Sequence, residues 1–165
     1  MLKKKKLLCV ILARSGSKGI KKKNIAPLNG HPLIAYTIKS ALKSNIFENI
    51  IVSTDSKYIK KVATKYGAEV PFLRPKKISS DKSRAIDAIY HAFKFCEKKY
   101  NIQYDYIVEL LCTNPLKTSL DIKKVVLKQI KTKADSVIAV MKLEDHHPIR
   151  IKKIINGKIK DFCLK

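Results

Sequence analysis

The sequence lacks several patterns that would place it in a common class. No segment approaches the roughly 20 consecutive apolar residues of a membrane span, so we expect no membrane association. The four cysteines show no C-x-x-C spacing and lie mostly in apolar runs, which is typical of packed thiols in a reduced, cytoplasmic protein. With 165 residues and no internal repeat or low-complexity linker, the chain is long enough to bury a core of its own.

Acidic residues are scarce, since 13 Asp and Glu stand against 36 Lys and Arg and give a formal net charge of +23. Such an excess is one sign of a nucleic-acid-binding domain. Only four of the basic residues are arginine, however, and the lysines are scattered over every expected helix and loop. A recognition surface more often gathers arginine and aromatic side chains on one face. We therefore expect a lysine-rich solvated surface and no specific nucleic-acid partner.

The two common phosphate-binding motifs are absent, but a related loop is present. Residues 7–13 are seven apolar residues in a row, which suits a strand buried on both faces of a parallel sheet. In the loop that follows, Gly16 and Gly19 are too close together for a P-loop, and no third glycine completes a dinucleotide fingerprint. The glycines permit positive φ and a close approach of the backbone, while Arg14 and nearby lysines supply positive charge. We predict a polyphosphate site at the carboxyl edge of an open α/β sheet.

Strand and helix patterns alternate along the chain, which predicts a three-layer α/β/α fold with a mostly parallel sheet. The expected strands are residues 7–13, 49–54, 69–73, 106–112 and 136–141. The expected helices are residues 32–44, 57–66 with a cap at 55–56, 83–99 and 119–131. In the third helix the side chains expected to face inward are Ile86, Ile89, Phe93 and Cys96. Residues 149–155 and 158–162 flank Asn156-Gly157, a strong hairpin pattern, and predict a β-ribbon.

The loop after the first strand resembles the signature of the sugar-acid cytidylyltransferases, especially the acylneuraminate (CMP-sialic acid synthetase) group. The matching segments are residues 12–20 (LARSGSKGI), 23–24 (KN), 27–34 (PLNGHPLI), 52–55 (VSTD), 74–75 (RP), Asp81 and 113–118 (TNPLKT). The resemblance implies a nucleotide-diphospho-sugar transferase-like (Rossmann-like) domain over residues 1–141. It also implies that residues 142–165 begin a hairpin arm that packs on a second subunit of a homodimer. Without the resemblance, a simple edge hairpin explains the ribbon equally well.

The same resemblance implies an activity, the transfer of CMP from CTP to the anomeric hydroxyl of a sialic-acid-like nonulosonic acid, with release of pyrophosphate. The CMP-sugar would serve cell-surface glycan synthesis. Charge builds on the phosphoryl oxygens in such a reaction, so positioning, cationic side chains, loop amides and Mg²⁺ are expected to supply most of the catalysis. Sialic-acid enzymes usually carry a sugar-directed glutamine where this chain has Leu111. The sugar is therefore expected to be another nonulosonic acid, such as a legionaminic- or pseudaminic-like one.

Individual site residues follow from the resemblance. The predicted catalytic residues are Arg14 and Lys23. The predicted nucleotide-binding residues are Leu12, Ala13, Arg14, Ser15, Gly16, Lys18, Asn24, Arg74, Asp81 and Ser83. The predicted sugar-binding residues are Thr113 and Asn114. A guanidinium matches phosphoryl oxygens better than an ammonium does, which favours Arg14 as a phosphate clamp. Arg74 is expected to contact the pyrimidine, although Arg-Pro at a strand end is also consistent with a simple turn.

One feature of the resembled family is missing. Its full-length members hold the catalytic Mg²⁺ with an Asp-x-Asp pair, and no such pair occurs in this sequence. Asp55, at the end of the second strand, is left as either a metal ligand or a helix cap. The adjacent His146 and His147 lack a third ligand and are weak evidence for a metal. We expect a chain that ends inside the arm and has little activity alone, and a non-catalytic CTP-binding or dimerising remnant is the alternative.

Overall fold

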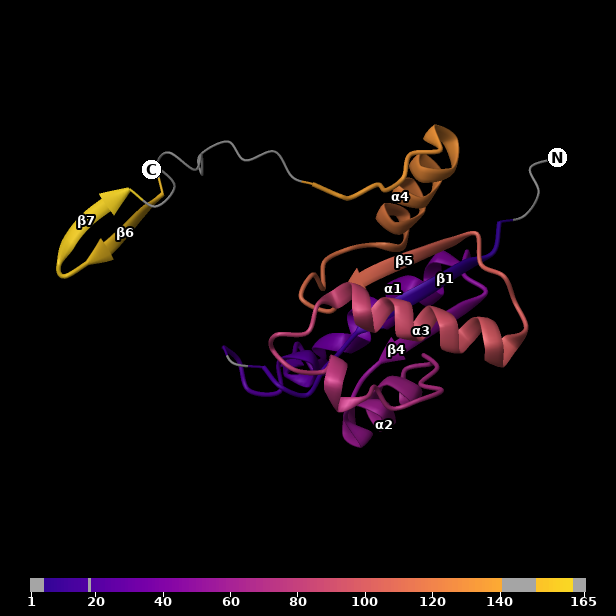
Figure 1. The fold of residues 1–165 in the computed structure, drawn as a ribbon, viewed down its shortest axis with the longest axis horizontal. Coiled ribbons are helices and arrows are strands. Elements are labelled where there is room, and N and C mark those ends of the chain that lie inside the picture. The colour runs from indigo at the N-terminus through magenta and orange to yellow at the C-terminus, as the bar shows by residue number, and fades with distance from the viewer. Residues whose placement is uncertain (1–4, 18, 141–150, 162–165) are drawn as a thin grey trace.

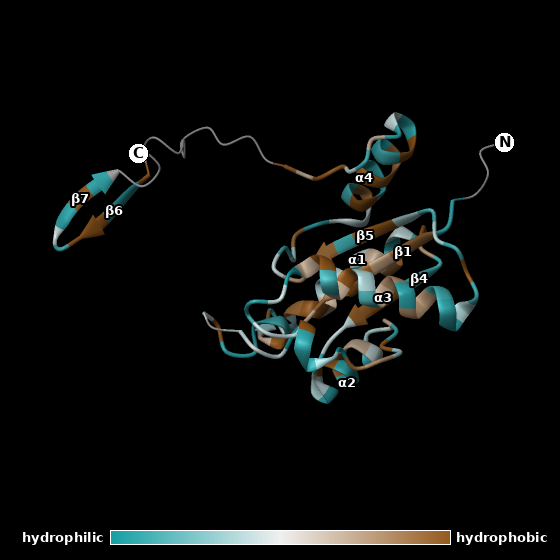
Figure 2. Cartoon of the chain, in the orientation of Figure 1, coloured by the Kyte–Doolittle hydropathy of each residue, from teal (hydrophilic) through white to brown (hydrophobic). Residues whose placement is uncertain are grey.

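The computed structural model describes residues 5–17, 19–140 and 151–161. Its central sheet has the strand order β4-β1-β5, and both strand pairs are parallel. The strands are β1 (Leu7–Leu12), β4 (Asn49–Ser53) and β5 (Tyr106–Leu111). Strand β1 lies between the other two, and its first five residues are fully buried because helices cover both faces of the sheet. Figure 2 shows apolar residues concentrated in these strands, whereas the helices carry polar and apolar residues.

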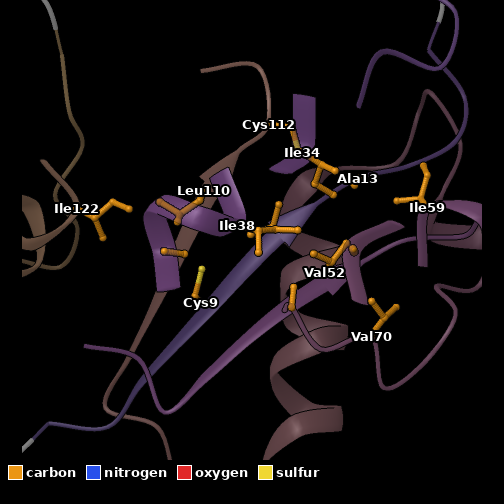
Figure 3. Close-up of a cluster of buried hydrophobic side chains, with 14 residues drawn as sticks. Cys9, Ala13, Ile34, Ile38, Val52, Ile59, Val70, Leu110, Cys112 and Ile122 are labelled. Carbon is orange, nitrogen blue, oxygen red and sulfur yellow. The ribbon is translucent and has the colours of Figure 1, made fainter. Parts of the chain in front are cut away.

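Helices pack on both faces of this sheet, which confirms the three-layer prediction. They are α1 (Leu33–Ser44), α2 (Lys57–Lys65), α3 (Ala85–Tyr100) and α4 (Ser119–Thr132). On one face, Cys9 and Ile11 of β1 pack in a cluster with residues of α1, α2 and α4, such as Ile38 (Figure 3). On the other face, Leu8 and Val10 pack against α3. Successive residues of β1 alternate between the two clusters, as the two-residue repeat of a strand requires.

Local sequence explains where two of the helices begin. The Ser56 hydroxyl accepts a hydrogen bond from the Ile59 amide at 3.3 Å and so caps α2. Asp55 precedes the cap, so the helix-cap role considered for it belongs to Ser56. Helix α4 begins with a capping box, in which the Thr118 hydroxyl and the Asp121 carboxylate bond to each other's backbone amide. The caps fix the residues just before α2 and α4. These residues end the loops that follow β4 and β5.

The structure differs from the sequence-based expectation at two strands. Residues 69–73 form only a single parallel bridge, between Ile51 and Glu69. Pro71 has no amide hydrogen to donate, and it restricts the residue before it, so the pairing does not extend. Residues 136–140 are not a strand and pair with no neighbour in the part of the chain that the structure describes. The central sheet among these residues therefore has three strands, where five were expected.

Helix α3 is also displaced from its expected limits and orientation. It begins at Ala85, two residues later than expected. Ile86 was expected to face inward, but its side chain is 57% exposed, whereas Cys96 is buried and Ile89 and Phe93 pack at the edge of the core. Ala88, Ala92 and Cys96 face the sheet at four-residue spacing, whereas Ile86, in the first turn of the helix, lies beside this stripe and is exposed.

Two short ribbons complete the described structure. The first pairs β2 (Pro27–Leu28) with β3 (His31–Pro32) and was not anticipated. The second pairs β6 (Lys152–Ile155) with β7 (Lys158–Asp161), which confirms the hairpin prediction. Its turn has φ of 51° at Asn156 and 72° at Gly157, as a two-residue hairpin turn requires. The outer residues of the expected hairpin, 149, 150 and 162, lie outside the described residues.

The three cysteines that the structure describes, Cys9, Cys96 and Cys112, are all buried and free of disulfide bonds. This confirms the expectation of packed thiols for these three residues. None of the helices in the described ranges combines the length and the apolar character needed to cross a bilayer.

Candidate functional site

The carboxyl ends of β1, β4 and β5 form one edge of the sheet, where ligands bind in open α/β folds. Leu12 pairs in register with Ser53 of β4 and Leu111 of β5, so the loops that follow the three strands start side by side. Ala13 continues the pairing because its amide donates to the Ser53 carbonyl at 3.0 Å. Ala13 is fully buried and Leu12 is half-buried. Both therefore set the starting point of the signature loop through their backbone.

Arg14 projects from the start of this loop to an aspartate of another loop. Its Nη1 lies 2.5 Å from Oδ1 of Asp81, and both side chains are about one-third exposed, at 35% and 39%. The structure thus brings together two residues that the sequence assigned to nucleotide binding from positions far apart in the chain. A Cβ added to Gly16 would lie 3.5 Å from the same Nη1, which is an ordinary contact.

The positive φ found in the signature loop does not fall on Gly16. Gly16 does not have a positive φ, contrary to the expectation from sequence. Among the described loop residues the positive φ falls on Lys22, at 54°, just before the short 3₁₀ helix Lys23–Ile25. Lys18 lies outside the described residues, so its predicted role stays a prediction.

Ser15 is held by Asp55, which follows β4. The Ser15 amide donates to Asp55 Oδ1 at 2.7 Å, and the Ser15 hydroxyl donates to Oδ2 at 2.6 Å. Burial by itself would raise the pKa of Asp55, but the Ser15 hydroxyl and amide, the Asp55 backbone and the charge of Arg74 outweigh it and leave the pKa below its ordinary value. Asp55 therefore accepts these bonds as a carboxylate.

Arg74 lies beneath the site rather than on its surface. It is 6% exposed, its Nε donates to the Ser53 hydroxyl at 3.0 Å, and its Nη2 donates to the Ser53 carbonyl. Burial lowers the pKa of Arg74. The negative charge of Asp55 opposes this shift and the positive charge of Arg14 adds to it, so the three charged groups interact electrostatically. The predicted contact of Arg74 with a pyrimidine would have to use N–H groups of the guanidinium that do not bond to Ser53.

Asn24 closes the loop from its other end. It lies in the 3₁₀ helix, is 8% exposed, and its amide nitrogen donates to the Arg14 carbonyl at 3.0 Å. The neighbouring Lys23 is half-buried, and its charge lowers the pKa of Cys112 slightly against the dominant effect of burial, which raises it. Lys23 directly precedes Asn24 in the same 3₁₀ helix, so its backbone lies at the same sheet edge as Arg14.

Ser83 is engaged within the loop that carries Asp81. Its hydroxyl accepts from the Ser80 amide at 3.1 Å and donates to the Lys77 carbonyl at 3.2 Å. Ser83 thus stabilises the conformation of residues 77–83, and its predicted contact with the nucleotide remains a prediction.

The loop after β5 carries the predicted sugar-binding residues Thr113 and Asn114, and both are exposed. Lys117 organises this loop, a role that sequence reasoning missed. Its Nζ donates to the Thr37 hydroxyl at 2.9 Å, to the Leu111 carbonyl at 2.6 Å and to the Asn114 carbonyl at 2.5 Å. Burial lowers the pKa of Lys117 although the nearby thiols oppose the shift. Only the position of a lysine three residues after Asn114 could have indicated this role.

The described side chains do not offer an evident metal centre. No group of three or more His, Cys, Asp or Glu residues that could hold a metal ion occurs among them. Both oxygens of Asp55 accept hydrogen bonds from Ser15, so the carboxylate considered as a metal ligand is already engaged. Mg²⁺ usually binds through one or two carboxylates together with substrate phosphates. The arrangement seen here does not fit a protein-held Mg²⁺, and we derive no chemical step from one.

Comparison with known proteins agrees with this geometry. The family profile described as cytidylyltransferase matches residues 8–153. The chain belongs to the cytidylyltransferase family. It is 39% identical over 145 residues to a pseudaminic acid cytidylyltransferase of Campylobacter jejuni, which covers 88% of this chain and 61% of that protein. It is 40% identical over 136 residues to a CMP-N,N'-diacetyllegionaminic acid synthase of Legionella pneumophila, which covers 82% of this chain and 57% of that protein.

A solved structure supports the fold of this cytidylyltransferase-family chain. The CMP:2-keto-3-deoxy-manno-octonic acid synthetase complexed with CTP superposes with a TM-score of 0.62 at 20% sequence identity. The match covers 78% of this chain and 49% of that one. The chain spans about 60% of the length of the two curated relatives named above, at 61% and 57%. The resemblance to this family inferred from the signature loop is thereby confirmed.

Proposed function

We propose that this chain binds CTP at the carboxyl edge of its sheet and transfers CMP to the anomeric hydroxyl of a sialic-acid-like nonulosonic acid. One observation carries the proposal, which is that Arg14 and Ser15 of the signature loop lie in a network with Asp55, Arg74 and Asp81 where three strands end. Two relatives whose names describe CMP transfer to pseudaminic or legionaminic acid support it.

In the proposed reaction the anomeric oxygen forms a bond to the α-phosphorus of CTP, and the bond from that phosphorus to the bridging oxygen of the β-phosphate breaks. The sugar hydroxyl loses its proton and pyrophosphate leaves. Arg14 and Lys23 would neutralise charge on the phosphoryl oxygens, because a preoriented cation at a partly buried site stabilises developing charge better than water does. Thr113 and Asn114 would bind the sugar acid from the neighbouring loop.

The end of β5 supports a narrower choice of sugar. Leu111 is 53% exposed there and offers no hydrogen-bonding group from its side chain. A site built around a polar contact strongly selects the ligand that makes it, and the Leu111 side chain cannot supply such a contact. We therefore propose a pseudaminic- or legionaminic-like acid rather than N-acetylneuraminic acid, in keeping with the two relatives named above.

Mg²⁺ is proposed to accompany the triphosphate, because this ion usually binds through substrate phosphates and waters together with one or two carboxylates. A homodimer is also proposed. The cross-strand pair Ile154 and Ile159 in the β6–β7 hairpin is 76% and 73% exposed, and exposed apolar pairs are typical of surfaces that contact another chain.

Pyrophosphate release tests the function. The protein would be incubated with Mg²⁺, a panel of sugar acids and each of the four nucleoside triphosphates. We expect release with CTP and with pseudaminic or legionaminic acid, and none without sugar. CTP binding without release would favour a non-catalytic CTP-binding or dimerising remnant. Equal binding of all four triphosphates, with tight and salt-dependent binding of DNA or RNA, would favour the nucleic-acid alternative, which the net charge of +23 keeps open.

A further inference from the structure

Asp55 touches the signature loop but has no assigned role in the proposed reaction. We propose that Asp55 is a positioning residue, which holds the loop after β1 in the conformation that receives the triphosphate, and that it contacts neither the ligand nor a metal. The inference rests on the proposed function and assigns a role to a residue within the same site.

The contact between Asp55 and Ser15 uses every donor of Ser15 and both oxygens of Asp55. Asp55 lies 40 residues after Ser15 in sequence, yet its two oxygens accept both hydrogen-bond donors of Ser15, the amide at 2.7 Å and the hydroxyl at 2.6 Å. A carboxylate that accepts two bonds from one residue fixes the orientation of that residue as well as its distance. Ser15 therefore has no donor left for a phosphate in this conformation, and its contribution to binding passes through Asp55.

The residues on either side of Asp55 are held in place by burial and hydrogen bonds. Thr54, just before it, is fully buried, and its hydroxyl accepts from the Ser56 amide at 3.1 Å. Ser56 in turn caps α2. Asp55 is thus held between the end of strand β4 and the start of helix α2. Its carboxylate is therefore a fixed point for the more exposed loop that carries Ser15.

The charge of Arg74 also acts on Asp55. Arg74 is anchored to Ser53 through Nε and Nη2, and its charge favours the ionised form of Asp55. An ionised carboxylate accepts hydrogen bonds and cannot donate them, which matches a partner that offers two donors. The hydrogen bonds from Ser15 favour the ionised form of Asp55 most, and the charge of the buried arginine adds to them.

The consequence concerns Arg14, which lies next to Ser15. Asp55 holds the residue on one side of Arg14, and Asn24 holds the Arg14 carbonyl at 3.0 Å. The backbone of the phosphate clamp is therefore fixed from two directions before any ligand arrives. A preordered loop binds more tightly because less conformational freedom is lost on binding.

The test compares Asp55→Ala, Asp55→Asn and the control Asp135→Ala, which removes an exposed carboxylate elsewhere. Hydrogen exchange at the Ser15 amide would report the loop, and calorimetric titration with CTP, with and without Mg²⁺, would report binding. We expect Asp55→Ala to lose Ser15 protection and to weaken CTP binding roughly tenfold, the effect of one or two lost hydrogen bonds. Asp55→Asn keeps a carbonyl acceptor and should restore part of both, while Asp135→Ala should match the parent.

Three results would overturn the proposal. One is an Asp55→Ala protein that loses Ser15 protection but binds CTP as the parent does. A second is weakened binding with Ser15 protection unchanged, because Asp55 would then contact the ligand directly. A third is weakening seen only when Mg²⁺ is present, which would make Asp55 a metal ligand. If Asp55→Ala does not fold, Ser15→Ala provides the same comparison from the other partner. If the parent binds no CTP, the proposed function fails, while amide exchange still decides whether Asp55 orders the loop.

Discussion

Nη1 of Arg14 lies 2.5 Å from Oδ1 of Asp81, so the arginine expected to clamp a phosphate is paired with a carboxylate. The two residues come from loops that follow different elements, β1 and the short 3₁₀ helix Lys76–Ile78. A triphosphate that binds Arg14 must displace Asp81 or share the guanidinium with it. Asp81 therefore lowers the affinity of the clamp for anions even if it also contacts the nucleoside.

Removing the charge of Asp81 should separate these two effects. In Asp81→Asn we expect inorganic triphosphate to bind several-fold more tightly, because Arg14 is released from a partly exposed ion pair worth up to about 1 kcal/mol. CTP should gain less, or lose affinity, if Asp81 contacts the nucleoside as the family resemblance implies. Titration of both ligands into the parent and the variant measures the difference. Unchanged affinity for inorganic triphosphate would mean that Arg14 does not bind phosphate.

Arg14→Ala should have the opposite result for both ligands. Loss of one charge-assisted bond of about 1.5–3 kcal/mol predicts binding of CTP and inorganic triphosphate weakened by roughly 10- to 100-fold. The midpoint of thermal unfolding should stay close to that of the parent, because the side chain is 35% exposed. Lys21→Ala, at an exposed position in the same loop, is the matched control. Equal losses in the two variants would indicate general attraction of a basic surface.

The Ser15–Asp55 contact predicts a pH dependence with a defined sign. The native pKa of Asp55 lies below its ordinary value. The stabilisation from this contact is therefore complete above the unfolded pKa and is lost as pH falls through the native pKa. Ser15→Ala removes the hydroxyl donor and should raise the pKa of Asp55 toward its ordinary value. Carbon-13 NMR titration of the Asp55 carboxyl in the two proteins checks the shift, and identical curves would contradict it.

The β6–β7 hairpin predicts an effect on assembly. In Ile154→Lys with Ile159→Lys, two exposed cross-strand apolar side chains become charged. We expect light scattering after size-exclusion chromatography to show a dimer for the parent and a monomer for the variant, with CTP binding retained. Replacing the exposed Lys153 and Lys160, which also face each other across the strands, by serine is the matched control. A parent protein that is monomeric at all concentrations would remove the proposal of a dimer arm.

The central part of the fold could be predicted because its residues follow local rules. Residues 7–12 are apolar without interruption, and Asn156-Gly157 suits only a few turn types, so β1 and the β6–β7 hairpin were both expected. The expected strand over 136–141 fails within its described part for a reason that local pattern does not contain. Ile138 and Val140 alternate with other residues as in a strand, but their side chains are 77% and 83% exposed. A strand also needs a neighbouring strand with which to pair, and the described residues provide none here.

The site was predicted as a set of residues but not as an arrangement. The signature loop and Arg74 could be identified from sequence because they match a family pattern. Nothing in the sequence indicated that Arg74 would be buried against Ser53, or that Asp55 would bond to Ser15 rather than cap α2 or bind a metal. Such pairings join residues separated by 21 and 40 positions, and their geometry depends on how the strands align in the sheet.

The three buried thiols can serve as probes of local unfolding, because each reacts only when the structure around it opens. Burial raises the pKa of Cys96 to about 12 and that of Cys112 to about 11, and it raises the pKa of Cys9 as well. Alkylating reagents react with the exposed thiolate, so none of these sulfurs can be labelled while the sheet and its helices stay closed. Cys96 is part of α3 and packs on one face of the sheet, whereas Cys9 and Cys112 belong to the cluster on the other face. The rates at which the three become labelled therefore measure whether the two layers separate together or one before the other.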